Sequence, residues 1–239
     1  MRVVSWNLRR NAKAIDYAFD VLNADILLAQ ECNQMNHPGL FTTGRFIDER
    51  WVKHKWGNIS FSKNPVEEIE IDSGYLGSMH LFSVMSPIGK LALGNLYGLF
   101  EKVAPESRNK MVTSGLHRKL SDLSPLLWAR VPHDFEAFML MGDLNLDRRM
   151  DEHPNFRKKN QNPVAGVMKR FEDFQLEDLL LRDYPEYVQT YRPVRGNFPW
   201  QLDHAFASRK VSHRLKTIVI SGPAVDSLSD HNPIVVDIN

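Results

Sequence analysis

The sequence predicts an α/β protein in which β-sheets pack against each other and helices lie outside them. Three observations support this class. Short apolar runs of strand length recur along the whole chain. The helical patterns between them are few but long. No internal repeat or low-complexity linker divides the 239 residues, so we expect a single domain over residues 1–239.

The composition restricts the classes of protein to consider. Hydrophobic residues make up 43% of the chain and charged residues 25%, which is typical of a soluble globular protein. No run of about 18 apolar residues occurs, so we expect no membrane span. A strand pattern starts at Arg2, which leaves no room for a signal peptide, and Cys32 is the single cysteine. We therefore expect a cytoplasmic protein without an internal disulfide.

The net charge also restricts the possible partners. At +1, it provides no global basic field, so attraction to nucleic acid must come from local clusters of charge.

The chain opens with a β-α-β pattern. Residues 3–7 form a strand pattern, residues 11–23 carry apolar side chains at helical spacing, and residues 25–30 form a second apolar strand. Asn7 and Glu31 should therefore lie at the carboxyl ends of neighbouring strands. The next segment, up to residue 57, is punctuated by Pro and Gly and is predicted to be irregular. Further strands are predicted at residues 58–62, 67–71, 80–86 and 90–97.

The second half begins with the longest helical pattern, residues 106–128, which Pro125 should bend or end. Residues 137–141 form a short buried strand that leads into Gly142-Asp143-Leu144-Asn145, and residues 147–162 are predicted to be a surface loop. Helical turns are predicted at residues 164–171 and 176–181, and strands at residues 188–191, 202–207, 217–221 and 234–238.

Polar side chains follow several of these strands, where catalytic groups commonly collect. Glu31 comes directly after an apolar strand, and a buried carboxylate needs either a metal ion or a salt bridge. Asp143 and Asn145 are two residues apart, so in extended backbone they point to the same side. They could orient a water and hold a phosphate oxygen, or they could form an Asx turn. Asn7 could equally be a turn or cap residue.

Asp203 and His231 are expected to be partners although they are far apart in sequence. Asp203 precedes Ala205-Phe206-Ala207, a buried strand pattern, so its carboxylate needs a partner. His231 lies beside Asp230 in a Pro-bounded turn just before the terminal strand. A surface turn pair is the alternative reading of Asp230 and His231.

Five short motifs resemble, in order and approximate spacing, the endonuclease/exonuclease/phosphatase superfamily. They are Ser5-Trp6-Asn7, Gln30-Glu31, Gly142-Asp143-Leu144-Asn145, Gln201-Leu202-Asp203-His204 and Ser229-Asp230-His231-Asn232-Pro233. The superfamily includes deoxyribonuclease I, exonuclease III, AP endonucleases, deadenylases, sphingomyelinases and inositol-polyphosphate 5-phosphatases. The resemblance spans nearly the whole chain and implies a four-layer α/β/β/α sandwich.

The resemblance implies a metal site in this chain. Glu31 is similar in position to the main Mg²⁺ or Mn²⁺ ligand of the family, with Asn7 and Asp230 nearby as direct or water-mediated ligands. Hard divalent cations of this kind prefer oxygen donors and usually keep several waters.

The resemblance also implies catalytic roles. Asp143 would orient or deprotonate the attacking water, and Asn145 would hydrogen-bond the phosphate. His231 would contact a phosphate oxygen or shuttle a proton, while Asp203 would fix the tautomer of its imidazole. Tyr97 occupies a position where family members carry a His or Tyr phosphate contact, although it could also be a half-buried strand aromatic.

Three pairs of arginines flank the candidate loops. They are Arg9 and Arg10, Arg148 and Arg149, and Arg192 and Arg195. These pairs could form a basic rim around an anionic substrate, and we select Arg9, Arg10 and Arg192 as substrate-binding candidates. Ordinary solvated loop charge is the alternative, because two aspartates flank the middle pair. Trp200 could stack on a base or pack beneath its loop.

The sequence therefore predicts a metal-dependent phosphodiester hydrolase, in the first place a nuclease that acts on DNA or RNA. A phosphatase or phospholipase-type phosphodiesterase of the same superfamily is the alternative within the enzyme class. A catalytically silent binding domain would be expected to lack an acid or the histidine, and none is missing here. Repair activity is not predicted, because Cys32-Asn33 stands where the AP endonuclease branch carries a lysine.

Overall fold

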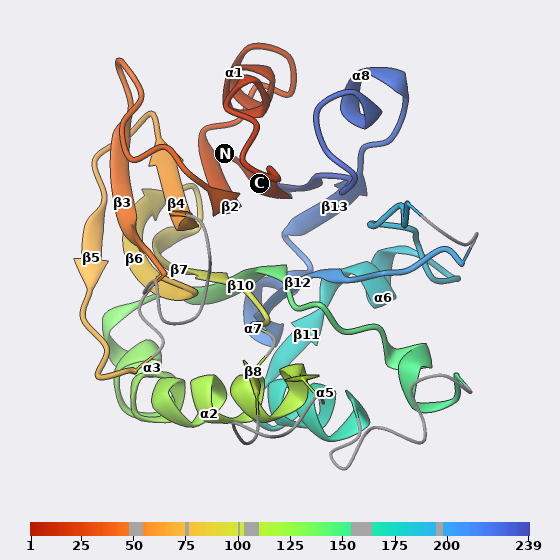
Figure 1. The fold of residues 1–239 in the computed structure, drawn as a ribbon. Coiled ribbons are helices and arrows are strands. Elements are labelled where there is room, and N and C mark those ends of the chain that lie inside the picture. The colour runs from red at the N-terminus through yellow and green to blue at the C-terminus, as the bar shows by residue number, and fades with distance from the viewer. Residues whose placement is uncertain (48–54, 75–76, 100, 103–109, 154–163, 195–197) are drawn as a thin grey trace.

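Two six-stranded mixed sheets pack face to face, and helices cover both outer faces (Figure 1). The computed structural model describes residues 1–47, 55–74, 77–99, 101–102, 110–153, 164–194 and 198–239. The strand order is β13-β14-β1-β2-β4-β3 in the first sheet and β11-β12-β10-β7-β6-β5 in the second. The predicted four-layer α/β/β/α sandwich is thus confirmed.

The first sheet is built around β1 (Arg2–Asn7), which pairs in parallel with β2 (Ile26–Cys32) and antiparallel with β14 (Ile234–Ile238). Its other strands are β3 (Phe41–Phe46), β4 (Gly57–Ser62) and β13 (Leu215–Val219). Helices α1 (Lys13–Asp20) and α8 (Pro223–Asp226) lie on its outer side (Figure 1).

The second sheet is built around β10 (Ala137–Asp143), which pairs in parallel with β7 (Gly89–Leu96) and antiparallel with β12 (Asp203–Ser208). Its other strands are β5 (Glu67–Ile69), β6 (Met79–Ser86) and β11 (Leu176–Asp178). The outer layer contains α2 (Val112–Pro125), the π-helical turn Leu126–Arg130, α3 (Val131–Asp134) and α5 (Val164–Asp173). Shorter elements are β8 (Glu101–Lys102), β9 (Lys110–Met111), the 3₁₀ turn Arg148–Asp151, α6 (Leu179–Asp183) and α7 (Arg209–Ser212).

Strand alternation explains how apolar strands bring polar groups to the site. On β1, Val3 packs between the two sheets, whereas Val4 and Trp6 pack in the layer that contains α1. Because side chains alternate along a strand, Asn7 points to the same side as Val3. On β10, Asp143 likewise points to the same side as the inter-sheet residues Met139 and Met141. Each central strand therefore ends in a polar side chain at the inter-sheet space.

The structure differs from the sequence prediction in three places. Residues 41–46, predicted to be irregular, form the edge strand β3. The segment 176–181, predicted to be a helical turn, begins as strand β11 and becomes helical only at Leu179. Residues 188–191 form no strand, and Tyr191 makes only isolated bridges to Trp200 and His231. Short or exposed segments such as these carry too little apolar pattern to be assigned.

Two further predictions concern helices. The start of the helix predicted at residue 106 lies outside the described residues. At Pro125, where a bend or an end was predicted, α2 passes into the π-helical turn Leu126–Arg130. Among the helices in the described part of the chain, none combines the length and apolar character needed to cross a membrane.

Candidate active site

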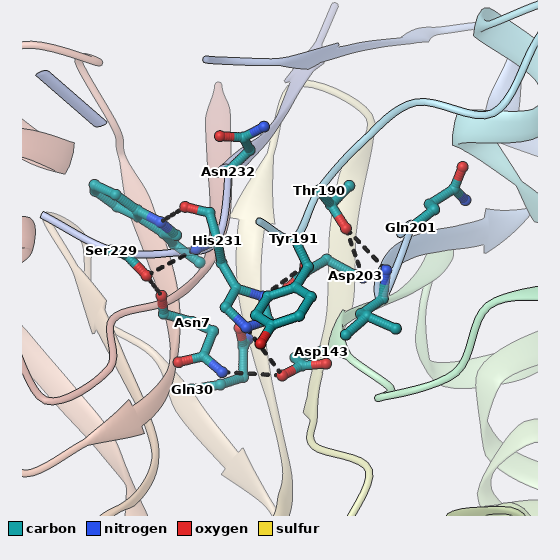
Figure 2. A network of polar contacts seen from close by, with 12 residues as sticks. Asn7, Gln30, Asp143, Thr190, Tyr191, Gln201, Asp203, Ser229, His231 and Asn232 are labelled. Atoms are coloured by element: carbon teal, nitrogen blue, oxygen red, sulfur yellow. Dashed lines mark hydrogen bonds and ion pairs between the residues drawn. The ribbon is translucent and has the colours of Figure 1, made fainter. Parts of the chain in front are cut away.

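The candidate site lies at the end of the sandwich where β1, β2, β7 and β10 have their carboxyl ends. Side-chain hydrogen bonds join the sheets at this point (Figure 2). Asn7 of the first sheet donates from Nδ2 to Asp143 Oδ2 of the second over 2.9 Å. His231, in the turn before β14, contacts Asp203 at the start of β12. The site is therefore assembled from both sheets.

His231 and Asp203 form a buried hydrogen-bonded pair. Their Nδ1 and Oδ2 atoms are 2.8 Å apart, so the contact expected from the sequence is present. A carboxylate accepts a hydrogen bond, so Nδ1 carries the hydrogen and Nε2 is directed to the other side. There Nε2 lies 3.8 Å from Asp143 Oδ2.

The turn that carries His231 is anchored to β1. The indole Nε1 of Trp6 donates to the carbonyl of His231 over 2.8 Å. The hydroxyl of Ser229 donates to the carbonyl of Asn7 over 2.7 Å and accepts from the backbone N–H of His231 over 3.1 Å. The Ser5-Trp6-Asn7 motif thus positions the imidazole of His231 as well as the side-chain amide of Asn7.

Glu31 is aimed into the site by a bulge in β2. The pairing of β2 with β4 shifts between Ala29 and Cys32, and Glu31 has a φ of +48°. A bulge of this kind re-aims side chains and is common beside active sites. The carboxylate of Glu31 accepts hydrogen bonds from Asn7 Nδ2 over 3.1 Å and from the hydroxyl of Tyr97 over 3.2 Å.

Asn7 presents its amide nitrogen, not its oxygen, to the two carboxylates of Glu31 and Asp143. Its Oδ1 accepts from the backbone N–H of Arg9 over 3.0 Å. In this orientation the amide bridges the two acids. For the metal-ligand role expected from the sequence, the carboxamide of Asn7 would have to flip so that Oδ1 replaces Nδ2 on the side of the two acids.

Asp143 and Asn145 form the Asx turn that was the structural alternative, and they do so inside the site. The backbone N–H of Asn145 donates to Asp143 Oδ1 over 2.8 Å, and Asn145 has a φ of +53°. The amide of Asn145 donates to the carbonyl of Gly98 over 3.1 Å, next to Tyr97. The turn therefore holds Asn145 beside the acid.

Burial sets the protonation of the groups around Asp143. Burial and the nearby Asp203 carboxylate raise the pKa of Asp143 to about 7, against the lowering effect of His231. Burial lowers the pKa of His231, but the carboxylates of Asp203 and Asp143 outweigh it and raise the pKa to about 9. Burial, followed by the charges of Asp143 and Glu31, raises the pKa of Tyr97 well above its usual value, so its hydroxyl stays a neutral donor.

The donor set fits a hard divalent cation. Asp143, Asp203 and His231 each offer a ligand atom, and these atoms lie within 4.8 Å of one another. The carboxylate of Glu31 accepts a hydrogen bond from the same Asn7 amide nitrogen as Asp143 does. In this cluster two buried carboxylates face a single imidazole, so a cation would stabilise it. Carboxylate oxygens are the donors that Mg²⁺ and Mn²⁺ prefer.

Five of the six arginines of the expected basic rim lie in the described part of the chain, and their contacts differ. The guanidinium of Arg9 is about half exposed and pairs with Asp230 over 2.8 Å, while Arg10 is exposed and donates its backbone N–H to the carbonyl of Glu31. Arg192 instead directs its guanidinium to Asn232 Oδ1 and the carbonyl of Ser229 and thereby supports the His231 turn. The remaining arginines pair with acids, Arg148 with Asp178 and Arg149 with Asp147, and Arg195 lies outside the described residues.

Two neighbouring residues of the site were not predicted from the sequence. The ring of Tyr191 lies 4.8 Å from the imidazole of His231, and Thr190 contacts the start of β12 (Figure 2). Trp200 stands beside Tyr191 through a backbone bridge and packs against Phe198, with ring centroids 4.1 Å apart. No local pattern marks Thr190 or Tyr191, because their position depends on contacts with distant segments.

Comparisons with known proteins agree with this architecture. A structure of an AP endonuclease from Archaeoglobus fulgidus has a TM-score of 0.74 at 18% identity, covering 100% of this chain and 99% of that one. A 3′ phosphatase from Neisseria bound to a product DNA hairpin gives 0.71 at 15%, covering 100% and 99%. A mannosyl-6-phosphatase from Bacteroides thetaiotaomicron gives 0.61 at 16%, covering 100% and 99%. At such identities the likeness is one of fold.

The sequence itself settles the family. No curated protein sequence matches the chain. However, residues 4–231 match the endonuclease/exonuclease/phosphatase family, and this span includes the candidate site residues from Asn7 to His231. The chain belongs to the endonuclease/exonuclease/phosphatase family.

Proposed function

We propose that the protein is a divalent-metal-dependent phosphodiester hydrolase that acts on nucleic acid. The observation that carries the proposal is the buried row of Asp203, His231 and Asp143, with Glu31 joined to Asp143 through Asn7. This row places a proton acceptor (Asp143), an oriented imidazole (His231) and the acid that orients it (Asp203) within a few ångströms of one another.

The geometry suggests how the side chains divide the work. Asp143 would take the proton of the attacking water, for which a pKa of about 7 is suitable near neutral pH. His231 is held by Asp203 with Nε2 outward, so it could donate to a phosphate oxygen as negative charge develops there. Tyr97 and Asn145 add neutral donors next to the acids.

A metal ion would complete this arrangement. Glu31, with Asp230 and a turned Asn7, would hold Mg²⁺ or Mn²⁺, which would neutralise charge on the phosphate during the reaction. The protein's own groups then have to position the phosphate and move the proton.

Two observations favour nucleic acid as substrate. Arg9 and Arg10 lie two and three residues after Asn7, close to Glu31, and their side chains are accessible to a polyanion. Among proteins of the same fold, one of the structures above is described as bound to a DNA hairpin and another as an AP endonuclease.

A phosphatase that acts on a small phosphoester is the second candidate. Arg192, Arg148 and Arg149 are each engaged with groups of the protein itself, so less positive charge is free at the expected basic rim. A mannosyl-6-phosphatase also shares this fold. Both observations are compatible with a substrate that needs only a small positive surface.

A substrate panel separates the two candidates. The purified protein is assayed on single-stranded DNA, duplex DNA, abasic DNA, RNA and simple phosphomonoesters, each with Mg²⁺, Mn²⁺ or EDTA. The proposal expects cleavage of a nucleic acid that EDTA abolishes. Turnover of phosphomonoesters alone would favour the second candidate, and activity that persists in EDTA would contradict metal dependence.

Salt dependence tests the role of Arg9 and Arg10. Each phosphate contact that an arginine neutralises contributes roughly 0.7 to 0.9 to the slope of log affinity against log salt concentration. Replacing both arginines by Ala should therefore lower the slope by about 1 to 2 and raise KM more than it lowers kcat. The measurement is binding of a labelled oligonucleotide at several salt concentrations.

The charge-matched control replaces two exposed lysines, Lys63 between β4 and β5 and Lys216 on β13. An equal slope in the Arg9/Arg10 variant would remove these residues from the binding surface.

A further inference from the structure

The two members of the His231–Asp203 pair belong to different sheets, so some part of the chain must fix the distance between them. Asp203 begins β12 of the second sheet, and His231 stands in the turn before β14 of the first. The segment Gln189 to Arg192 runs between these two places (Figure 2). Its contacts reach both.

Thr190 makes contacts in both directions. Its hydroxyl oxygen accepts hydrogen bonds from the backbone N–H groups of Leu202, over 2.9 Å, and Asp203, over 3.0 Å. Its carbonyl accepts from the backbone N–H of Asn232 over 2.7 Å. One fully buried residue is thus bonded to the backbone of Asp203 and to that of the residue after His231.

The neighbours of Thr190 strengthen the second contact. The amide of Asn232 donates to the carbonyl of Gln189 over 2.9 Å, and the backbone N–H of Arg192 donates to the carbonyl of Asp230 over 2.8 Å. Tyr191 pairs with His231 through a backbone bridge and lays its ring against the imidazole. The His231 turn is therefore held on both sides of the imidazole.

We propose that Thr190 is a positioning residue of the reaction, which sets the Asp203–His231 distance by bonding the backbones of both strand ends. The hydroxyl can hold the start of β12 because an alcohol oxygen has two lone pairs and can accept from the N–H groups of Leu202 and Asp203 at once, while the carbonyl of Thr190 holds Asn232. Serine would keep this function. Valine, which has nearly the same shape, would leave two buried N–H groups without this acceptor and would release the start of β12.

The kinetic test rests on the proposed function and compares T190V with T190S. A displacement of about 1 Å at a catalytic pair can cost on the order of 100-fold in rate. We expect T190V to lower kcat by about 10- to 100-fold with little change in KM, and T190S to restore most of it. The matched control is T113V, which removes another buried threonine hydroxyl, on α2, and should leave kcat unchanged. If T190V does not fold, T190C replaces it, because a thiol is a weak acceptor.

A double-variant cycle distinguishes positioning from general destabilisation. If Thr190 acts through Asp203, T190V should cost little more in a D203N background, because the interaction that it supports is already lost. Equal fold-losses in both backgrounds would overturn the proposal, as would a T190S enzyme that is as impaired as T190V.

A spectroscopic test does not depend on any substrate. In the protein without metal, the Nδ1 proton of His231 should give a downfield NMR resonance, which is identified by its absence in D203N. We expect T190S to keep this resonance and T190V to broaden it or move it upfield. An unchanged resonance in folded T190V would show that Thr190 does not position the pair, even if the substrate panel had failed to find an activity.

Discussion

Replacing His231 by Ala and Asp203 by Asn should each lower kcat severely, and the double variant should be little worse than His231→Ala alone. We expect a loss of about 10²- to 10⁴-fold for each single variant, the range that a positioned general acid or base contributes. The reason is structural. The carboxylate of Asp203 lies 2.8 Å from Nδ1 of His231, so it acts on the reaction through the imidazole.

Three rate measurements on folded protein decide this prediction. Residues that act as one unit give strongly non-additive losses, whereas independent residues give additive free energies. His204→Gln is the matched control, since His204 is equally buried but contacts the carbonyl of Leu146 and lies near Asp178, away from the site. An Asp203→Asn enzyme with near-normal rate would show that the hydrogen bond has no catalytic role.

Glu31→Gln should lower activity by about two orders of magnitude or more and shift the divalent-ion titration to higher concentration. The amide keeps the shape of the side chain and can still occupy the bulge of β2, so the fold should persist. What is lost is the negative charge that holds a hard cation.

Titration calorimetry with Mn²⁺ measures this effect independently of catalysis. Glu67→Gln provides the control, because Glu67 is an exposed carboxylate on the edge strand β5 that pairs with Lys90. A Glu31→Gln variant with an unchanged Mn²⁺ affinity would exclude Glu31 from the metal site, whereas weakened binding in Glu67→Gln would point to an unspecific effect of charge.

The sequence was informative about the fold where strands are buried. β1, β2, β10 and β14 were predicted because a strand covered on both faces, or ending in a buried layer, needs a continuous apolar run. β3 was missed because it is an edge strand with an exposed or half-exposed Thr-Thr-Gly-Arg stretch. Edge strands face solvent and need no such pattern.

For the site, the sequence could indicate which residues belong together but not how they are held. Glu31, Asp143, Asp203 and His231 lie together because each stands at or near a strand end on the same edge of the sandwich. The role of an arginine, by contrast, depends on its partner, which a single sequence does not reveal. Arg192 was expected to bind substrate, and in the structure its charge is directed to the turn beside His231.

The assembly of the site from two sheets has a consequence for which residues evolution can change. The hydrogen bonds from Asn7 to Asp143 and from His231 to Asp203 both run from one sheet to the other. The rate of the reaction should therefore depend on how the two sheets are placed relative to each other. A slip of one sheet along the other by a single residue, about 3.3 Å, would break both hydrogen bonds. Selection for activity should therefore extend to apolar residues in the inter-sheet core, such as Val3, Met139 and Val236, which no substrate could touch.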